Sequence, residues 1–208
     1  MTTIRFFMIG SWTEGMFHFQ KLKPHIQSTK SGQIQARLFR LPVGYPILLS
    51  NEADCRKPNT QGQIHGQILE ISSDTTLLSL LDTFHGVHPS DSIKSLFHRR
   101  EVSVLDEDGH FVTSQVYMMN PLKLPKGSME LTGNCWKKSL LEQPPLPSTL
   151  TERQAEIVKQ LGNAKGRDVV LVKDLSLYRD LMKLELIVDK GRRLALSPLG
   201  KDVFRYLN

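Results

Sequence analysis

The chain has 208 residues, of which 39% are hydrophobic and 23% are charged, and its formal net charge is +6. This composition is ordinary for a water-soluble globular protein, and the length suffices for one medium-sized domain followed by a small one. No segment approaches the roughly 18 consecutive apolar residues of a helical membrane span, and the first apolar run is too short for a signal peptide. We therefore expect no membrane partner and no secretory leader.

The spacing of cysteines and histidines argues against disulfides and metal sites. Cys55 and Cys135 are the only cysteines, and they lie far apart with no CxxC pair. His85 and His88 do not form the HxxxH or HExxH pattern of a helical zinc site. We therefore predict no disulfide, no bound metal and a reducing, cytoplasmic location.

Residues 4–118 have the pattern of several strands and one helix. Ile34, Ala36 and Leu38 alternate with polar residues, as in a half-buried strand. Leucines at helical spacing predict a helix over Thr75–Phe84, with its cap among residues 72–74. Asp106–Gly109 ends in Asp-Gly between two β-prone segments, which predicts a hairpin. The predicted strands are Ile4–Ile9, Ile34–Phe39, Ile64–Leu69, Arg99–Leu105 and Phe111–Met118. This order predicts an α+β fold with a largely antiparallel sheet that can close on itself.

A proline-rich stretch marks the predicted domain boundary. Gln143–Thr149 holds three prolines in four residues, which favours an extended and semi-rigid linker. We place a first domain over residues 1–142, the linker over 143–150 and a second domain over 151–208.

The second domain has the pattern of a winged helix. Thr151–Gln154 fits a helix capping box, and further elements follow in the order strand, helix, two strands and helix. They are predicted over Val169–Val172, Asp174–Leu186, Ile187–Val188, Arg192–Leu196 and from Pro198 onward. Residues 148–208 contain 12 Lys and Arg against 8 Asp and Glu, a net +4. Lys190, Arg192 and Arg193 lie on the predicted wing, where contacts with nucleic-acid phosphates are expected, although many winged helices bind proteins instead.

Three short motifs in the first domain combine glycine turns with polar or aromatic residues. Ile9–Gly15 contains Gly10 at the end of the first strand, where backbone N–H groups can hold a carboxylate. Leu41–Pro46 is a loop that presents Tyr45. Leu81–Gly86 ends the leucine-rich helix, with His85 before the glycine. Taken singly, each motif also fits an ordinary turn, a packed corner or a helix-terminal histidine.

Together and in this order, the motifs resemble the γ-glutamylcyclotransferase-like family over about residues 3–141. That family has a strand ending in Tyr-Gly-Thr/Ser-Leu, a Leu-Pro-x-Gly-Tyr-Pro loop and a Gly-Glu-Leu/Val-Tyr strand. A Leu-Asp-x-x-Glu-Gly helix end, a Tyr-x-Arg-x-x-Val strand, a Val-Tyr strand and a Ser-Gly-Asp-Trp close follow. The corresponding segments here are Ile9–Trp12, Leu41–Pro46, His65–Leu69, Leu81–Gly86, Phe97–Val102, Val116–Met118 and Leu131–Trp136.

The resemblance implies a small mixed, mainly antiparallel β-barrel with short helices. It also implies an enzyme without a cofactor or metal that cyclises a γ-glutamyl group to 5-oxoproline and releases an amine or amino acid. The family's glutamate, which takes a proton from the substrate amine, corresponds to His85 in this chain. The residues expected to bind substrate are Ile9, Gly10, Ser11, Trp12, Tyr45 and Tyr117.

The departures from the family pattern leave two functions open. His85 replaces the family's glutamate, and Ile9 and Trp12 replace its usual Tyr and Leu. A neutral imidazole can act as a base near pH 7, whereas a charged one would repel the substrate ammonium. Asp82 is a nearby carboxylate, about one helical turn earlier. The chain is therefore either a transferase acting on γ-glutamyl amines or peptides, or a pseudoenzyme. In the second case the barrel binds a small molecule or protein and the winged helix contacts DNA or a protein.

Overall fold

The computed structural model describes residues 3–49, 62–72, 75–131, 136–165, 170, 172–191 and 193–208. The chain divides into two compact units, Met1–Leu141 and Glu142–Asn208. Several predicted features lie outside the described residues: Cys55, Cys135, Arg192, residues 169 and 171 of the predicted strand Val169–Val172, positions 73–74 of the predicted helix cap, and residues 132–135 of the last motif.

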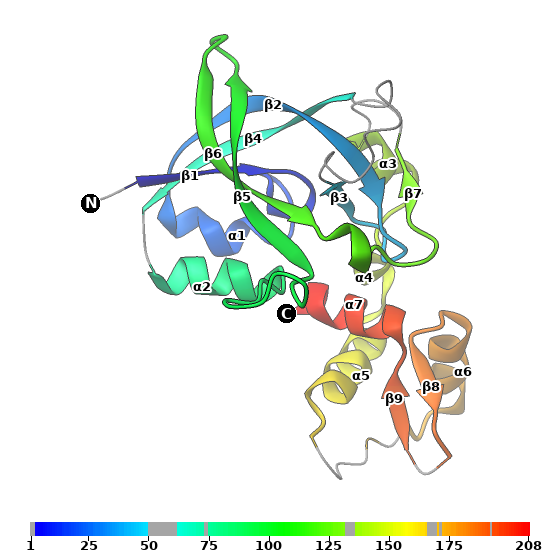
Figure 1. Cartoon of the computed structure of the whole chain (residues 1–208). Coiled ribbons are helices and arrows are strands. Elements are labelled where there is room, and N and C mark those ends of the chain that lie inside the picture. The colour runs from blue at the N-terminus through cyan, green and yellow to red at the C-terminus, as the bar shows by residue number, and fades with distance from the viewer. Residues whose placement is uncertain are drawn as a thin grey trace. The chain divides into compact units, whose positions relative to one another are not determined.

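The first unit is a closed β-barrel (Figure 1). Its ring runs β1-β4-β2-β3-β6 and returns to β1, and only the pairs β1–β6 and β3–β6 are parallel among the described strands. The strands are β1 Thr3–Met8, β2 Ile26–Arg40, β3 Pro46–Leu49, β4 Gly62–Ser72, β5 Phe97–Asp106, β6 Phe111–Met119 and β7 Met129–Glu130. This confirms the mixed, mainly antiparallel barrel that the sequence predicts.

Strand β2 is much longer than the predicted segment Ile34–Phe39. Its polar residues 27–31 show no apolar alternation. They are part of the strand because β2 pairs with β4 from Ile26 onward, with an irregularity in register between Ile26 and Ser28. Gly32 and Gly66 face each other in this pairing. A Cβ on Gly66 would lie 2.5 Å from the ring of Phe7 and 2.5 Å from the Met8 carbonyl oxygen. Only glycine therefore lets the two strands and the Phe7 ring come this close.

The predicted hairpin forms between β5 and β6. Asp106 Oδ1 accepts hydrogen bonds from the backbone N–H groups of Asp108 (3.0 Å) and His110 (2.8 Å). Gly109 has a φ of +82°, which favours glycine at that position of the turn. Local chemistry of the turn thus fixes the register in which β5 meets β6.

Short helices accompany the barrel. The helix α2, Thr75–Phe84, forms where the leucine spacing predicts it, and Leu77 and Leu81 are its buried side chains. Figure 1 shows α1, Phe19–Leu22, and α2 on the same side of β1. The other helices among the described residues before the second unit are the 3-10 turns Gly10–Trp12, Lys23–His25 and Pro121–Lys123, and α3 Trp136–Glu142.

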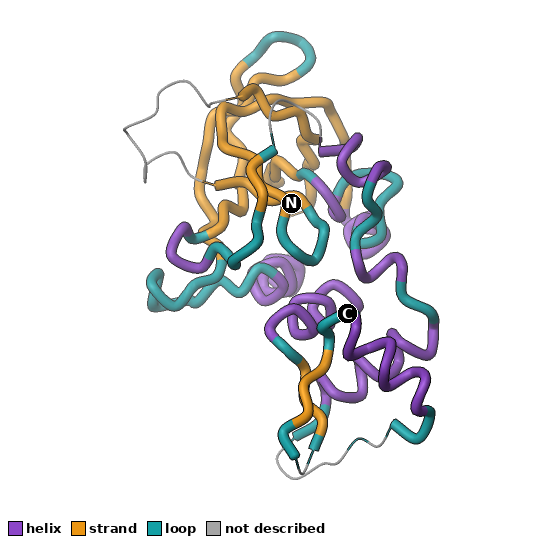
Figure 2. Tube along the Cα trace, turned by 90° about the vertical axis from the view of Figure 1, so that its right-hand side faces the viewer, coloured by secondary structure: helices purple, strands orange, loops and turns teal. Residues whose placement is uncertain are grey.

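The second unit consists of helices with one β-hairpin in its described part (Figure 2). Its elements are α4 Leu146–Thr149, α5 Glu152–Asn163, α6 Leu175–Lys183, β8 Ile187–Asp189, β9 Leu194–Leu196 and α7 Pro198–Leu207. The capping box at Thr151 and Gln154 forms as expected. Part of the stretch expected to be extended is the one-turn helix α4, because its proline, Pro147, lies in the first turn, where proline is tolerated. The winged-helix assignment stays a prediction.

Replacing Gly66 tests the close approach inside the barrel. We expect Gly66→Ala to lower the free energy of unfolding by roughly 1–3 kcal/mol, because a backbone oxygen next to the new Cβ cannot move aside easily. Both tryptophans, Trp12 and Trp136, belong to the first unit, so tryptophan fluorescence during urea unfolding reports on the barrel. His65→Ala, at the exposed neighbouring position, should change stability by less than about 0.5 kcal/mol. Equal effects of the two changes would contradict this account.

Candidate active site

The glycine turn after β1 is held from two sides. Gly10 has a φ of +66°, and a Cβ there would lie 3.0 Å from the Pro46 ring. The Gly10 carbonyl accepts hydrogen bonds from the N–H (3.2 Å) and hydroxyl (2.8 Å) of Thr13. The N–H of His18 donates to the Ser11 carbonyl at 2.9 Å. The first two sequence motifs are therefore in contact, because Pro46, at the end of the second motif, packs against Gly10.

Tyr45 supports that loop. Its carbonyl accepts a 2.9 Å hydrogen bond from the Leu41 N–H, and Gly44, at φ +99°, donates to the Leu41 carbonyl at 2.8 Å. The Tyr45 side chain is buried, and burial raises the pKa of its hydroxyl. Ile9, which precedes the turn, is only partly buried.

The imidazole of His85 is fixed at the end of α2. Its Nδ1 lies 2.8 Å from the Leu81 carbonyl oxygen, and its own backbone N–H also donates to that oxygen, at 3.0 Å. A carbonyl oxygen only accepts hydrogen bonds, so Nδ1 carries a proton. In the neutral ring the lone pair is then on Nε2, the arrangement that a general base needs. Gly86, at φ +59°, lets the chain turn away immediately afterwards.

Aromatic rings surround this imidazole. The rings of His85 and Tyr117 are parallel, with centroids 3.8 Å apart, and Phe97 meets His85 edge-on at 5.3 Å. The Trp12 ring lies 6.1 Å from His85 and 4.9 Å from Phe84. Trp12 is 3% exposed and His85 is 7% exposed. The structure thus brings the turn and the imidazole together, with the Trp12 ring between them.

The carboxylate of Asp82 is hydrogen-bonded to Tyr117, which stacks on His85. The Tyr117 hydroxyl donates a 2.7 Å hydrogen bond to Asp82 Oδ1, and Arg99 Nη2 lies 3.5 Å from Asp82 Oδ2. Burial, followed by the hydrogen bond to Asp82 and its charge, raises the pKa of Tyr117 well above its usual value. Tyr117 therefore stays a neutral donor, and the negative charge remains on Asp82 next to Arg99.

Sequence reasoning did not find Arg99, Phe84 or His18 as neighbours of the site. The three-residue spacing of Asp82 and His85 could have placed both on one helical face. No local signal marks the contact of His18 with Trp12, whose ring centroids are 4.8 Å apart.

The predicted wing residues border a cavity in the second unit. Lys190 and Arg193 line a space of about 430 Å³ together with Lys201 and apolar side chains. Among the described residues that line it, none is acidic. Arg192 lies outside the described residues.

One group of side chains in the described part of the chain has the geometry of a metal site. Asp106, Asp108 and His110 offer ligand atoms within 4.8 Å of one another. They form the β5–β6 turn, and Asp106 Oδ1 already accepts two backbone hydrogen bonds there. This group belongs to the hairpin and not to the candidate active site. Among the described helices, none is long and apolar enough to cross a membrane.

The fold defines the class of protein: a small closed barrel in which a glycine turn after the first strand meets the end of a helix. The chain belongs to the γ-glutamyl cyclotransferase, AIG2-like family, whose model matches residues 6–138. This confirms the resemblance seen in the sequence. No curated protein matches the chain.

Solved structures with low sequence identity accompany the family match. YkqA from Bacillus subtilis is 19% identical, with a TM-score of 0.41, over 57% of this chain and 36% of its own. An AIG2-like protein from Mus musculus is 21% identical, with a TM-score of 0.43, over 60% of this chain and 86% of its own. A protein from Arabidopsis thaliana is 20% identical, with a TM-score of 0.47, over 69% and 85%. The match thus spans about a third of the length of YkqA.

The pH dependence of stability tests the bond between Tyr117 and Asp82. At pH 7 we expect Tyr117→Phe to be less stable than the wild type by about 1–2 kcal/mol, because it loses this hydrogen bond and keeps the ring. The folded state raises the pKa of Tyr117, so its stabilising contribution is complete below the unfolded pKa of about 10 and is lost as the pH rises above it. Urea unfolding from pH 7 to pH 11 should therefore show the gap closing. A constant gap would contradict the raised pKa.

Proposed function

We propose that the barrel catalyses a γ-glutamyl cyclotransferase reaction in which neutral His85 acts in place of the family's glutamate. Its substrates are γ-glutamyl amines or peptides, and its products are 5-oxoproline and the released amine. The observation that carries the proposal is the hydrogen bond from His85 Nδ1 to the Leu81 carbonyl, 2.8 Å long. This bond orients the ring and leaves its lone pair on Nε2.

The proposed reaction needs one proton to move from one nitrogen to another. His85 Nε2 removes a proton from the substrate α-amine, which attacks the γ-carbonyl carbon and forms the five-membered lactam. The bond between that carbon and the leaving nitrogen then breaks. The imidazolium returns its proton to the leaving nitrogen, so the enzyme ends in its starting state. The reaction requires no oxidant and no net proton.

The glycine turn supplies the proposed binding site for the substrate α-carboxylate. The first backbone N–H groups of a helical turn have no acceptor within the turn, so Gly10–Trp12 presents donors that suit a carboxylate. In this proposal the Tyr117 ring, which stacks on His85, lines the same site. The loop containing Tyr45 packs against the turn through Pro46. In this proposal the loop does not touch the substrate and affects binding only by positioning Gly10.

Product analysis tests the reaction directly. Incubation with a panel of γ-glutamyl amines should release 5-oxoproline, and His85→Ala should reduce the rate roughly a hundredfold or more, the usual cost of losing a general base. The exposed His88 provides the control, since His88→Ala should leave the rate unchanged.

The pH profile separates a base from a structural role. In the wild type the rate should rise with pH as the imidazole loses its proton. His85→Glu introduces the residue that the family motif has, and its rate should rise at a lower pH, because a carboxylic acid is a stronger acid than an imidazolium. Identical profiles for the two proteins would remove His85 from the proton transfer.

The position of Trp12 favours a second candidate, a barrel that binds a γ-glutamyl ligand without turnover. Trp12 is 3% exposed and lies between the turn and His85, where the family's usual leucine would leave more room. In this case the wild type binds members of the panel but releases no 5-oxoproline. The double variant Trp12→Leu/His85→Glu should then gain the activity.

The cavity bordered by Lys190, Arg193 and Lys201 favours contact with a nucleic acid for the second unit, as opposed to a protein partner. We expect the full chain to retard duplex DNA at low salt and to lose this as salt rises. Lys190→Ala/Arg193→Ala should weaken binding and lower the slope against salt by about 0.9 for each phosphate that the variant no longer neutralises. Arg153→Ala, an exposed charge on α5, is the control. Absence of retardation at low salt would favour a protein partner.

A further inference from the structure

An opening of about 260 Å³ lies in the barrel wall between β2 and β5, and we call it the slot. Within the described residues these two strands pair at only two positions, the second of which is Gln33 with Leu105. Beyond this pair the strands separate. Gln35 and Ser103, which would lie opposite each other if the pairing continued, both line the slot. The slot is therefore the place where a sheet between β2 and β5 begins and is left incomplete.

Strand β5 has unpaired hydrogen-bonding groups along the edge that faces the slot. The N–H of Asp106 donates to the His110 carbonyl at 2.8 Å, so the backbone groups of Asp106 point toward β6. In an antiparallel pair these groups alternate in direction from one residue to the next. The N–H and C=O groups of Ser103 and Glu101 therefore point away from β6, and no described strand pairs with these two residues on that side. Such an edge is a template for an added strand.

The inner part of the slot is apolar. Ile34 and Met118 line it and are 5% and 7% exposed, and Val102 lies beside them on β5. The volume is below the 300–1,000 Å³ typical of sites for drug-sized ligands. The slot is therefore suited to one apolar side chain, inserted from outside the barrel.

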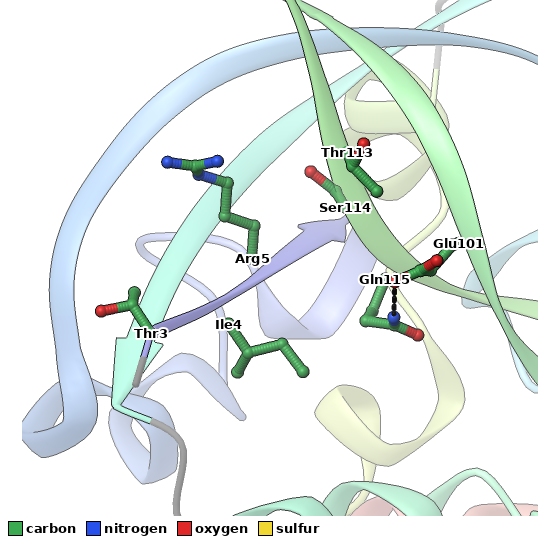
Figure 3. Close-up of a pocket in the computed structure, with 7 residues that line it drawn as sticks. All are labelled: Thr3, Ile4, Arg5, Glu101, Thr113, Ser114 and Gln115. Carbon is green, nitrogen blue, oxygen red and sulfur yellow. Dashed lines mark hydrogen bonds between the residues drawn. The ribbon is translucent and has the colours of Figure 1, made fainter. Parts of the chain in front are cut away.

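Charge distinguishes the slot from the other opening beside this hairpin. Among the described residues that line the slot, none is charged. The other opening is a polar cavity between β1 and β6, and its lining includes Arg5 and Glu101 (Figure 3). The Glu101 carboxylate is held by Gln115, whose Nε2 donates to its Oε1 at 3.1 Å, as the dashed line in Figure 3 shows. A charge that entered the slot would lose its hydration without gaining a partner, so the occupant is uncharged there.

We propose that the slot binds an extended, uncharged peptide segment of a partner protein, which adds a strand to the edge of β5. The segment runs antiparallel to β5, as β2 does. Its apolar side chain opposite Val102 enters the slot, and the residues on either side exchange backbone hydrogen bonds with Ser103 and Glu101. None of these residues belongs to the catalytic or substrate-binding set proposed above, so the proposal does not depend on the cyclotransferase reaction.

Titration of the full chain with a capped peptide tests the site. The probe is acetyl-Thr-Thr-Leu-Thr-Thr-amide, in which the leucine is the side chain for the slot. Two-dimensional amide NMR should show saturable shifts centred on residues 33–35 and 101–103. The same peptide with aspartate in place of leucine should bind roughly tenfold more weakly or worse. No saturable shift with the leucine peptide would overturn the site, and equal binding of the aspartate peptide would overturn the apolar slot.

Two N-methylated peptides test the strand pairing. A methyl group on the leucine nitrogen replaces an N–H that points away from β5 in the proposed register. The same methyl group on the next threonine replaces an N–H that donates to the β5 edge, so this peptide should bind roughly tenfold more weakly than the first. Equal affinities of the two peptides would overturn the added strand.

Two variants at one position test the edge from the side of the protein. Ser103→Pro removes the N–H that points away from β6 and leaves the bonds between β5 and β6 intact, since proline is tolerated on such an edge. It should weaken binding of the leucine peptide roughly tenfold or more. Ser103→Ala keeps the N–H and should retain the affinity. Equal affinities of the two variants would remove the β5 edge from the site.

The N-methylated peptides test the same bond in the unchanged protein, so the proposal can fail even where Ser103→Pro does not fold. Release of 5-oxoproline, if present in the wild type, should be unaffected in Ser103→Ala.

Discussion

Closure of the barrel depends on the pairing of β1 with β6 at Phe6 and Gln115. Beside this pair the ring of Phe6 stacks on that of Tyr117, with centroids 5.8 Å apart. Because the two strands run parallel, the turn that ends β1 reaches the same end of the barrel as Tyr117 and the His85 ring stacked on it. At the other end the strands separate and leave the cavity beside Arg5. One short contact thus determines where the candidate active site lies.

In the candidate active site, the imidazole and the Asp82 carboxylate have different hydrogen-bond partners. His85 donates a proton to a backbone carbonyl, and Tyr117 remains a neutral hydroxyl because its pKa is raised. The negative charge of Asp82 is shared between that hydroxyl and Arg99. If His85 stands at the position of the family's glutamate, as the sequence motif predicts, an aromatic ring replaces a carboxylate there. In the proposed reaction, the substrate amine would meet the His85 ring and its aromatic neighbours Tyr117 and Phe97.

Local signals in the sequence predicted much of the barrel. The Asp106–Gly109 turn and the leucines of α2 act over a few residues, and both elements form where expected. Strand β3 was missed because all four of its side chains are buried and show no alternation. The bond from Tyr117 to Asp82 joins residues 35 apart in sequence, and the Trp12 ring is placed by contacts with His18 and Phe84. Such contacts depend on the closed barrel, so no short pattern could reveal them.

Strand β2 has a consequence for how the chain acquires its shape during synthesis. It bonds with β3, β4, β5 and β7, and its Arg37 meets Glu130, which is 93 residues later. The barrel cannot close until β6 has left the ribosome, since β1 waits for Gln115. Pairings over such separations form slowly, and unpaired strands are prone to associate with other chains in the meantime. Strands β1 to β4 can pair with one another within the first 72 residues, but β1 and β3 keep an unpaired edge until β6 emerges, so closure of the barrel comes late in synthesis.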